Sequence, residues 1–369
     1  MPLSEKLQRI ARNIIRVNMN VKERESVIIS AGPNSLDFAE ALVFEASKVG
    51  AYSSINYGSD RLALKIYKTA NEKYLKHYSN LSEILARKVD VEIMLDDSDP
   101  FMERQMPQNK IEIRRKATKP LRKIKDKRIV DKTIKSVLIG FPTKETARSM
   151  GISFGKLNKI FWDTMDVNYY RLHDTNKAVA RKLAGKSWIR IVGGDTDIKF
   201  SIRGREPILD SGLWAREKRG YLNLPAGEVF LAPVENSVNG EIYFDLPNLH
   251  YGMQIQGVWW KFRHGKLIDC SVDKGLKAFE DVYKNASGDK NRIGEFAIGT
   301  NPKARMTGGM IILDEKVRKT IHMAIGHNKH FGGVNDCTIH WDFFKDMRKN
   351  SIIEIDGKEF MKNGKLIDF

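Results

Sequence analysis

Cysteine is scarce in this chain: among 369 residues there are two, Cys270 and Cys337. Two cysteines cannot build a disulfide framework, and such scarcity is typical of proteins in a reducing compartment. Cys337 shares a strand phase with Ile339 and Trp341, away from the polar face of the same segment, so we expect a thiol packed in a core. The sequence therefore gives no support for a cysteine peptidase.

Long apolar stretches are missing as well. No run approaches the roughly 18 consecutive apolar residues that cross a membrane. The opening MPLSEKLQRIARNII predicts an amphipathic helix instead of a signal peptide, so we expect a cytoplasmic protein with no membrane contact. The length exceeds the size at which one core stops growing, and 41% hydrophobic residues are enough to fill two domains.

Negative charge is in short supply relative to positive charge. The chain has 63 Lys and Arg against 46 Asp and Glu, a formal net charge of +17. Its densest basic segment, residues 109–128, would suit a partner rich in phosphate, which keeps open a basic nucleic-acid-binding protein or a metal-dependent nuclease. This segment contains no aromatic residue for base stacking, however, and Pro120 interrupts it. The other interpretation is a solvated helical face.

The first half of the chain alternates predicted strands and helices. The run VIIS predicts a buried strand, LDFAEALVFEASKVG predicts a helix that ends at Gly50, and YSSINY predicts the next strand. Two further runs, VEIMLD and SVLIGFP, continue the pattern. The predicted strands occupy residues 27–30, 52–57, 91–96 and 136–142. This alternation is typical of α/β domains with an open parallel sheet and helices on both faces.

Two glycine-containing segments help to locate turns and the domain boundary. The loop GPNS lacks both the GxGxxG pattern and a GK[ST] ending, so we expect a tight turn with Asn34 or Ser35 as a helix N-cap instead of a phosphate site. The stretch SWIRIVGGDTDIKFSIRGR at 187–205 predicts a hairpin. We therefore expect an N-terminal α/β domain at 1–185 and a C-terminal α+β catalytic domain that binds metal at 186–369.

Two histidines project from apolar strands in the second half. In TIHWDFF, the period of two puts His340 and Asp342 on one face and the apolar side chains on the other. In KTIHMAIG, His322 is the polar residue of an otherwise apolar predicted strand. A single His-x-Asp pair is more often a hydrogen-bonded core pair or part of a polar surface than a pair of ligands. The joint occurrence of several such strands favours a metal site.

Two carboxylates complete the donor set. Glu228 opens the predicted strand in GEVFLAPV, and Glu295 opens the one in GEFAIG. Burying an ionised carboxylate is costly without a counter-charge, so these strands predict a shared divalent cation. Three carboxylates and two imidazoles exceed the ligands of one tetrahedral zinc and favour a pair of ions bridged by a carboxylate. Oxygen and nitrogen donors without thiolate are typical of zinc, cobalt or manganese sites.

Four sequence blocks around these residues resemble a known family. The blocks NLPAGEVFLAPVENSVNGEIYFD, RIGEFAIGTNP, DEKVRKTIHMAIG and GGVNDCTIHWDFF occur in this order across the C-terminal half. They resemble the aminopeptidase T and aminopeptidase S (PepS-type) family of metallopeptidases. The N-terminal half is similar to that family through its strand, loop and helix opening and through LIGFPTKETARSMG.

The resemblance implies a metallo-aminopeptidase with two divalent metal ions per chain. Its ligands would fall on the five residues that strand phase selects: Glu228, Glu295, His322, His340 and Asp342. Glu295 would lie near or between both ions and steer the attacking water. The family further implies a homodimer with a large cavity, which admits short peptide substrates that have a free N-terminus.

One position departs from the family pattern. Some members have a catalytic tyrosine seven residues after the histidine that matches His322, and Lys329 stands there in this chain. Within HNKHFGG, His327, Lys329 or His330 could polarise the scissile carbonyl or stabilise the oxyanion. The alternative is a polar loop near the mouth of the site. The missing tyrosine also keeps open a silent scaffold, in which the metals would serve stability alone.

Overall fold

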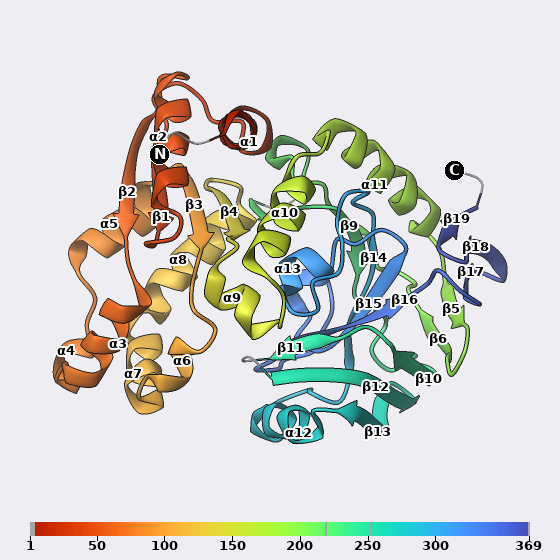
Figure 1. Cartoon of the computed structure of the whole chain (residues 1–369). Helices are drawn as coiled ribbons and strands as arrows, with labels where there is room; N and C mark the ends of the chain where they lie inside the picture. Colours follow the sequence, from red (N-terminus) through yellow and green to blue (C-terminus); the bar gives the residue numbers. More distant parts are fainter. Residues whose placement is uncertain (1–3, 218–219, 251–252, 368–369) are drawn as a thin grey trace. The chain divides into compact units, whose positions relative to one another are not determined.

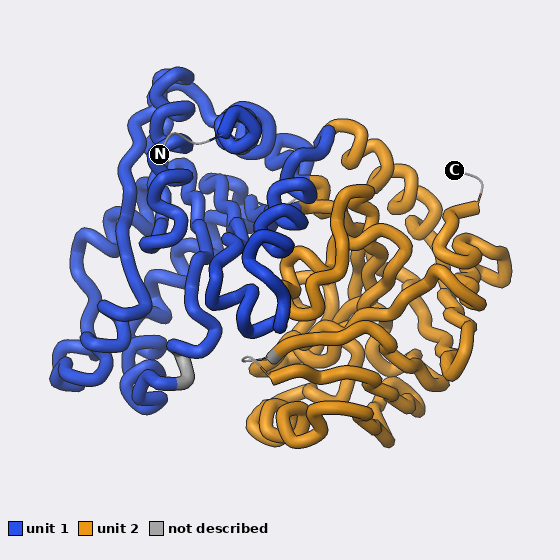
Figure 2. Tube along the Cα trace, in the orientation of Figure 1, with its two compact units in different colours: residues 1–169, 212–225 blue, residues 170–211, 226–369 orange. Residues whose placement is uncertain are grey.

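A computed structural model describes residues 4–217, 220–250 and 253–367 of the chain. These residues form two compact units, and neither unit is continuous in sequence (Figure 2). Unit 1 comprises residues 1–169 and 212–225, and unit 2 comprises residues 170–211 and 226–369. This division differs from the predicted boundary at 185/186 in two ways: residues 170–185 belong to unit 2, and residues 212–225, which include one strand of the unit 1 sheet, lie downstream of that boundary.

Unit 1 is built on a five-stranded sheet in the order β2-β1-β3-β4-β8, of which Figure 1 labels the first four strands. Every neighbouring pair in it is parallel. The strands are β1 (Ser26–Ala31), β2 (Tyr52–Tyr57), β3 (Val91–Asp96), β4 (Lys135–Gly140) and β8 (Tyr221–Leu224). The parallel α/β prediction is thus confirmed. The fifth strand was not predicted; its Leu222 and Leu224 are buried, and it pairs with β4.

Helices follow most of these strands along the chain. Two of these helices, α2 and α10, contribute to an aromatic cluster. Phe38 of α2 and Trp162 of α10 have ring centroids 4.9 Å apart, and Phe141, just after β4, contacts both rings. The helical segments of unit 1 are α1 (Glu5–Asn13), the π-helix η1 (Ile14–Asn18), α2 (Leu36–Ser47), α3 (Asp60–Thr69), α4 (Glu72–Leu75), α5 (Asn80–Lys88), α6 (Met102–Gln105), α7 (Gln108–Ala117), α8 (Lys119–Val130), α9 (Lys144–Ser149), α10 (Phe154–Met165) and the 3-10 turn η2 (Trp214–Arg216). Among the described helices, none combines the length and apolar character that a membrane crossing requires.

The basic segment 109–128 forms two helices, α7 and α8, with Pro120 in the first turn of α8. Several of its cations are bound by unit 1 itself. Arg122 donates to the carbonyl of Arg115 at 3.0 Å, and Arg128 donates to the carbonyl of Ala86 at 3.1 Å. Lys125 forms an ion pair with Glu92 of β3. A good part of the positive charge in this segment therefore holds the helices of unit 1 together.

Unit 2 consists largely of antiparallel strands in two sheets. One has the order β16-β15-β14-β9-β7, and the other has the order β11-β12-β10-β6-β5-β17-β18-β19, with β13 paired to β12. The strands are β5 (Trp188–Val192), β6 (Asp197–Ser201), β7 (Ile208–Asp210), β9 (Glu228–Leu231), β10 (Asn239–Phe244), β11 (Asn248–His250), β12 (Met253–Arg263), β13 (Lys266–Lys274), β14 (Ile293–Gly299), β15 (Thr320–Gly326), β16 (His340–Asp346), β17 (Ile352–Ile355), β18 (Lys358–Lys362) and β19 (Lys365–Leu366). The helical segments are α11 (Tyr169–Leu183), α12 (Leu276–Asn285), α13 (Ile311–Asp314) and the 3-10 turn η3 (Lys329–Phe331). The hairpin predicted at 187–205 is present as β5 and β6.

Both sheets of unit 2 contribute to one apolar core. Phe200 of β6 contacts Phe296 of β14 at 5.3 Å between ring centroids, and Trp260 of β12 contacts Phe343 of β16 at 5.0 Å. In the five-stranded sheet, alternate residues enter this core, which leaves the intervening residues for the opposite face. That opposite face carries the residues that the sequence singled out.

Candidate metal centre

Four adjacent strands place the five predicted ligands on one face of a sheet. Trp341 and Phe343 of β16 enter the core, so His340 and Asp342 project to the other side, as the alternation predicts. The remaining three strands follow the same rule. Glu228 begins β9, Glu295 is the third residue of β14, and His322 is the third residue of β15. The strand β14 begins at Ile293, two residues earlier than predicted, with a bulge between Ile293 and Glu295.

Strand register brings these side chains to neighbouring positions. Ala324 of β15 lies opposite Glu295 on one side and opposite Asp342 on the other. Two residues before Ala324, His322 lies opposite Ala297 of β14, and two residues after it, Gly326 lies opposite His340 of β16. Because Ala324 has a small side chain, the carboxylates of Glu295 and Asp342 flank a position with little side-chain bulk.

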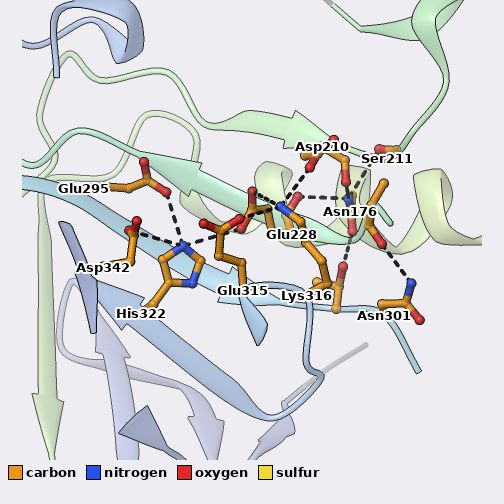
Figure 3. A network of polar contacts seen from close by, with 12 residues as sticks. Asn176, Asp210, Ser211, Glu228, Glu295, Asn301, Glu315, Lys316, His322 and Asp342 are labelled. Atoms are coloured by element: carbon orange, nitrogen blue, oxygen red, sulfur yellow. Dashed lines mark hydrogen bonds and ion pairs between the residues drawn. The ribbon is translucent and has the colours of Figure 1, made fainter. Parts of the chain in front are cut away.

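The donors form two groups that share Glu295. Glu228, Glu295 and His322 offer ligand atoms within 4.8 Å of one another, and Glu295, His340 and Asp342 do the same. The Nε2 atom of His322 lies 3.3 Å from Glu295 Oε1, 3.5 Å from Glu228 Oε2 and 4.0 Å from Asp342 Oδ1 (Figure 3). The Nε2 atom of His340 lies 3.4 Å from both Glu295 Oε2 and Asp342 Oδ1. One carboxylate therefore faces both imidazoles.

Burial and missing partners support a cation at this place. Glu228, Glu295 and Asp342 are each 4 to 6% exposed. Within the described part of the chain, Glu228 Oε2 and Asp342 Oδ1 are buried and accept no hydrogen bond. Buried carboxylate oxygens are rarely left without a donor, because desolvation then goes uncompensated. Two such oxygens that converge on imidazole nitrogens fit metal ligands.

The two central glutamates differ in their affinity for a proton. Burial raises the pKa of Glu295, but hydrogen bonds with His322 and His340 outweigh it and bring that pKa down to about 2. Burial and neighbouring carboxylates raise the pKa of Glu228 to about 8. Near neutral pH and without a cation, Glu295 is ionised, whereas Glu228 holds a proton that a cation must displace.

The orientation of His340 is fixed by the main chain. Its Nδ1 atom lies 2.8 Å from the carbonyl oxygen of His327. A carbonyl can only accept, so Nδ1 donates, and in a neutral ring the lone pair is then on Nε2, facing Glu295 and Asp342. Burial lowers the pKa of His340, but Asp342 and Glu295 outweigh it and raise the pKa well above its usual range. Without a cation, the ring therefore also carries a proton on Nε2, which a metal ion must displace before Nε2 can bind it.

A buried lysine that the sequence did not reveal lies behind Glu228. Lys316 is fully buried, and its ammonium lies 2.6 Å from Glu228 Oε1, 3.0 Å from Asp210 Oδ2 and 3.0 Å from Glu315 Oε2 (Figure 3). Burial lowers the pKa of Lys316, but the three carboxylates raise it well above the usual value. Glu228 therefore gives one oxygen to this ammonium and keeps the other for the centre.

A buried asparagine makes hydrogen bonds with the main chain next to the proposed metal centre. Asn176 of α11 donates through Nδ2 to the carbonyls of Asp210, at 3.0 Å, and Glu228, at 2.9 Å, and its Oδ1 accepts from Thr300 at 2.6 Å (Figure 3). These contacts tie together the end of β7, the start of β9 and the residue after β14. One amide thereby fixes the main chain from which Glu228 projects.

The three other predicted catalytic residues lie in the loop after β15. Lys329 is exposed, and its ammonium lies 2.6 Å from the Asp336 carboxylate. The rings of His327 and His330 are 5.1 Å apart, and His330 is exposed. Burial and the nearby His330 lower the pKa of His327. Of the three, His327 makes a described contact with a predicted ligand, through its carbonyl and His340.

Comparisons with known proteins identify the family and the fold of this chain. The sequence model of the thermophilic metalloprotease (M29) family matches residues 3–366. Aminopeptidase T of Thermus thermophilus is 26% identical, over 84% of this chain and 80% of that protein, and aminopeptidase AmpS of Bacillus subtilis is 22% identical over 98% of each. The solved structure of wild-type AmpT from Thermus thermophilus has a TM-score of 0.80 at 21% identity, covering 98% of this chain and 99% of that one. The fold is shared along the whole length.

Proposed function

Since this chain belongs to the thermophilic metalloprotease (M29) family, it is a metal-dependent aminopeptidase, and we propose that its centre holds two divalent ions. Glu228, Glu295 and His322 would hold one ion, and Glu295, His340 and Asp342 would hold the other. The observation that supports this proposal is the pair of donor groups that share Glu295. The substrates proposed are short peptides with a free N-terminus.

Charge balance supports two ions instead of one. The ligand carboxylates, together with Asp210 and Glu315, make five formal negative charges against the single ammonium of Lys316. The remaining formal charge of −4 equals the charge of two divalent cations. Burial raises the pKa of both Glu228 and Glu315 to about 8, so protons balance part of this charge in the metal-free fold, and two divalent ions balance it once binding has displaced those protons. The mixed oxygen and nitrogen donors suit zinc, cobalt or manganese.

Ions at these positions would polarise the scissile carbonyl and lower the pKa of a bound water to about 7. Glu295 is placed to accept a hydrogen bond from that water, because its carboxylate lies between both imidazoles and is ionised at neutral pH. Glu228 is held in place by Lys316, and His340 by the His327 carbonyl. These residues thus supply orientation, while no side chain has to form a covalent intermediate.

We keep His327, Lys329 and His330 as candidates for stabilising the oxyanion, and the contacts rank them. The Nε2 atom of His327 is buried and has no hydrogen-bond partner among the described residues, so no described side chain competes for it. The ammonium of Lys329 is already paired with Asp336. We therefore favour His327 for this role.

A homodimer and a cytoplasmic location also belong to the proposal; the first rests on the family resemblance, and the second on the scarcity of cysteine.

The direct test is cleavage of leucine p-nitroanilide by protein stripped with a chelator and then titrated with zinc, cobalt or manganese. An N-acetylated substrate serves as the matched control, since it lacks the free amine. We expect metal-restored cleavage of the free-amine substrate alone, with two ions bound per chain. Silence with every metal, combined with chelator-sensitive cleavage of DNA or RNA, would instead favour a nuclease. Metal binding without turnover on any substrate would favour a silent scaffold.

A further inference from the structure

The loop His327–Asn335, between β15 and β16, is closed by two buried asparagines. The carbonyl of Asn328 accepts from the amides of Phe331, at 2.9 Å, and Gly333, at 3.1 Å. Its side-chain oxygen accepts from the amide of Asn335 at 2.8 Å. Asn335 in turn donates through Nδ2 to the carbonyl of Gly326 at 3.1 Å. These hydrogen bonds, from the main chain and the side chains of the loop itself, make it one hydrogen-bonded unit.

A carboxylate from outside the loop anchors this piece. Glu235, in the connection from β9 to β10, is 5% exposed. Its Oε1 accepts from Asn328 Nδ2 at 2.9 Å and from the amide of Val334 at 2.7 Å, so it binds the loop near both ends. Its Oε2 accepts from Arg205 at 2.6 Å, and Arg205 also donates to the carbonyl of Gly332. The carboxylate and the guanidinium together make three hydrogen bonds with the loop and one with each other.

The same loop contacts His340 in two ways. The carbonyl of His327 accepts from His340 Nδ1, and the ring of Phe331 lies 5.2 Å from the His340 imidazole, at an interplanar angle of 70°. On its other side, Phe331 contacts the ring of Phe230 at 5.3 Å. The position and the rotation of the His340 ring therefore depend on where the loop lies.

We propose that Glu235 is a positioning residue for the metal centre. By anchoring the loop through Asn328, Val334 and Arg205, it fixes the carbonyl of His327 and the ring of Phe331 against His340. It thereby sets the affinity for the ion held by Glu295, His340 and Asp342. This inference rests on the proposed function. Glu235 touches neither that ion nor the substrate, and it acts through the loop alone.

A charged residue is required at position 235 for a physical reason. A buried ion pair gives little net stability compared with apolar residues of the same shape, but it tolerates only a narrow set of geometries. Glu235 combines such a pair with two hydrogen bonds from the loop. Partners that orient a metal-binding imidazole affect metal affinity by about 10-fold to 100-fold when they are removed. The same range is expected when the partner's anchor is removed.

The test replaces Glu235 with Gln in the full chain and measures metal binding by calorimetry after chelator treatment. The glutamine keeps one acceptor but removes the charge that Arg205 requires. We expect the affinity for one of two zinc ions to fall about 10-fold to 100-fold, with the other unchanged. Cobalt should report the same loss through an altered visible spectrum. Excess metal should restore kcat, and KM should stay as in the wild type.

Glu359→Gln is the matched control, because Glu359 is a half-exposed glutamate of unit 2 that pairs with Lys362. It should leave both affinities unchanged. A Glu235→Gln variant that melts earlier yet binds both ions as the wild type does would overturn the inference and leave a purely structural role. If Glu235→Gln does not fold, Arg205→Lys decides the matter, since it keeps the charge but not both contacts of the guanidinium. An unchanged metal affinity in that variant would likewise overturn the inference.

The outcome for the wild type separates this inference from the proposed function. A wild-type chain that binds two ions, beside a variant that binds them equally well, removes the role of Glu235 alone. A wild-type chain that binds no ion removes the proposed function, and the inference with it.

Discussion

Both units of this protein bury carboxylates at strands, but they treat the oxygens differently. In unit 1, Asp97 accepts from the amides of Asn34, at 2.8 Å, and Ser35, at 3.0 Å, just before α2, and Glu92 pairs with Lys125. In unit 2, oxygens of Glu228 and Asp342 are buried with no donor among the described residues. Burial of a carboxylate therefore does not mark a functional site by itself. Oxygens that lack donors and converge on imidazoles do.

The comparison also explains why the GPNS loop is not an anion site. The N-cap Ser35 makes no capping bond from its own side chain; the free amides before α2 are taken by Asp97 from the end of β3. An internal carboxylate thus fills the place that a phosphate would occupy. At this loop, unit 1 satisfies the free amides with its own carboxylate, whereas the sheet of unit 2 has carboxylate oxygens that lack donors and converge on imidazoles.

The largest effect should come from removing the carboxylate that both donor groups share. Glu295→Gln should lower kcat by about a thousandfold or more, since it removes the proposed acceptor for the water and a ligand of both ions. The stripped variant should still fold but melt at a lower temperature, because the ionised carboxylate of Glu295 is the partner of both imidazoles. Steady-state kinetics with leucine p-nitroanilide measures the first effect. Activity near that of the wild type would refute the assignment of Glu295.

The buried ammonium of Lys316 offers the next largest effect. Lys316→Met leaves three buried carboxylates without their counter-charge, so unfolding free energy should fall by about 3 to 5 kcal/mol. Urea denaturation of the stripped protein measures it. Lys362→Met, at a half-exposed lysine of the same unit, should cost less than about 1 kcal/mol. Equal losses of unfolding free energy in the two variants would show that Lys316 contributes no more to stability than a half-exposed lysine does.

Metal binding should depend on pH through Glu228. Its pKa is about 8 in the metal-free fold against an ordinary 4.5, so an ion must displace a proton below about pH 8. Affinity should therefore rise with pH by at least about tenfold per pH unit below about 8, because the ions must also displace the proton that His340 carries. The stability of the metal-free protein should change with pH in the opposite direction. Because folding raises the pKa of Glu228, its protonated carboxyl stabilises the folded state at low pH, and this contribution is lost as pH rises from 4.5 through about 8. Calorimetry and melting curves of stripped protein at several pH values would show both trends, and a flat metal affinity would contradict them.

In unit 1, the satisfied carboxylate should matter for stability and for nothing else. Asp97→Asn weakens the bonds to the amides before α2 and should cost about 1 kcal/mol of unfolding free energy. Metal affinity should be unchanged. Asp126→Asn, at an exposed aspartate of α8, provides the control and should cost less than about 0.5 kcal/mol. A loss of metal affinity in Asp97→Asn would break the contrast between the two units.

The smallest effect is expected at Lys329, the position that departs from the pattern of the resembled family. Its ammonium pairs with Asp336 at the surface, so Lys329→Ala should change kcat by less than about twofold and stability by less than about 1 kcal/mol. His327→Ala is the informative comparison, because the contacts favour that residue near the substrate. A large loss of kcat in Lys329→Ala would return the oxyanion role to the lysine.

The sequence predicted which side chains share the polar face of the sheet because strands have a simple period. Trp341 and Phe343 identify the core face of β16, so His340 and Asp342 had to lie opposite, and the structure has them there. Lys316 could not be found in this way, since it lies in a turn after α13, where no periodicity says which side chains are inside. Its neighbours Asp210 and Glu228 are distant in sequence, and a lysine is ordinarily an exposed residue. Long-range ion pairs of this kind need coordinates.

The fold was predicted to a similar extent. The four early strands were each identified, because parallel strands read as apolar runs between helices. The strand β8 was missed, since YLNL is short and stands beside the metal-binding block. The basic segment was left between two interpretations, because composition does not show that Arg122 and Arg128 donate to carbonyls of their own unit.

The late strand β8 has a consequence for how the polypeptide is made. The parallel sheet lacks its last member until residue 224 has left the ribosome, after β5, β6 and β7 of the other unit have already emerged. Until then β4 has an open edge, a template for association with another chain. A proteolytic cut near residue 185 would put β4 and β8 on different fragments. Limited digestion there should therefore yield fragments that stay together through this pairing, or that aggregate through the open edge of β4 once they separate, and not two independent halves.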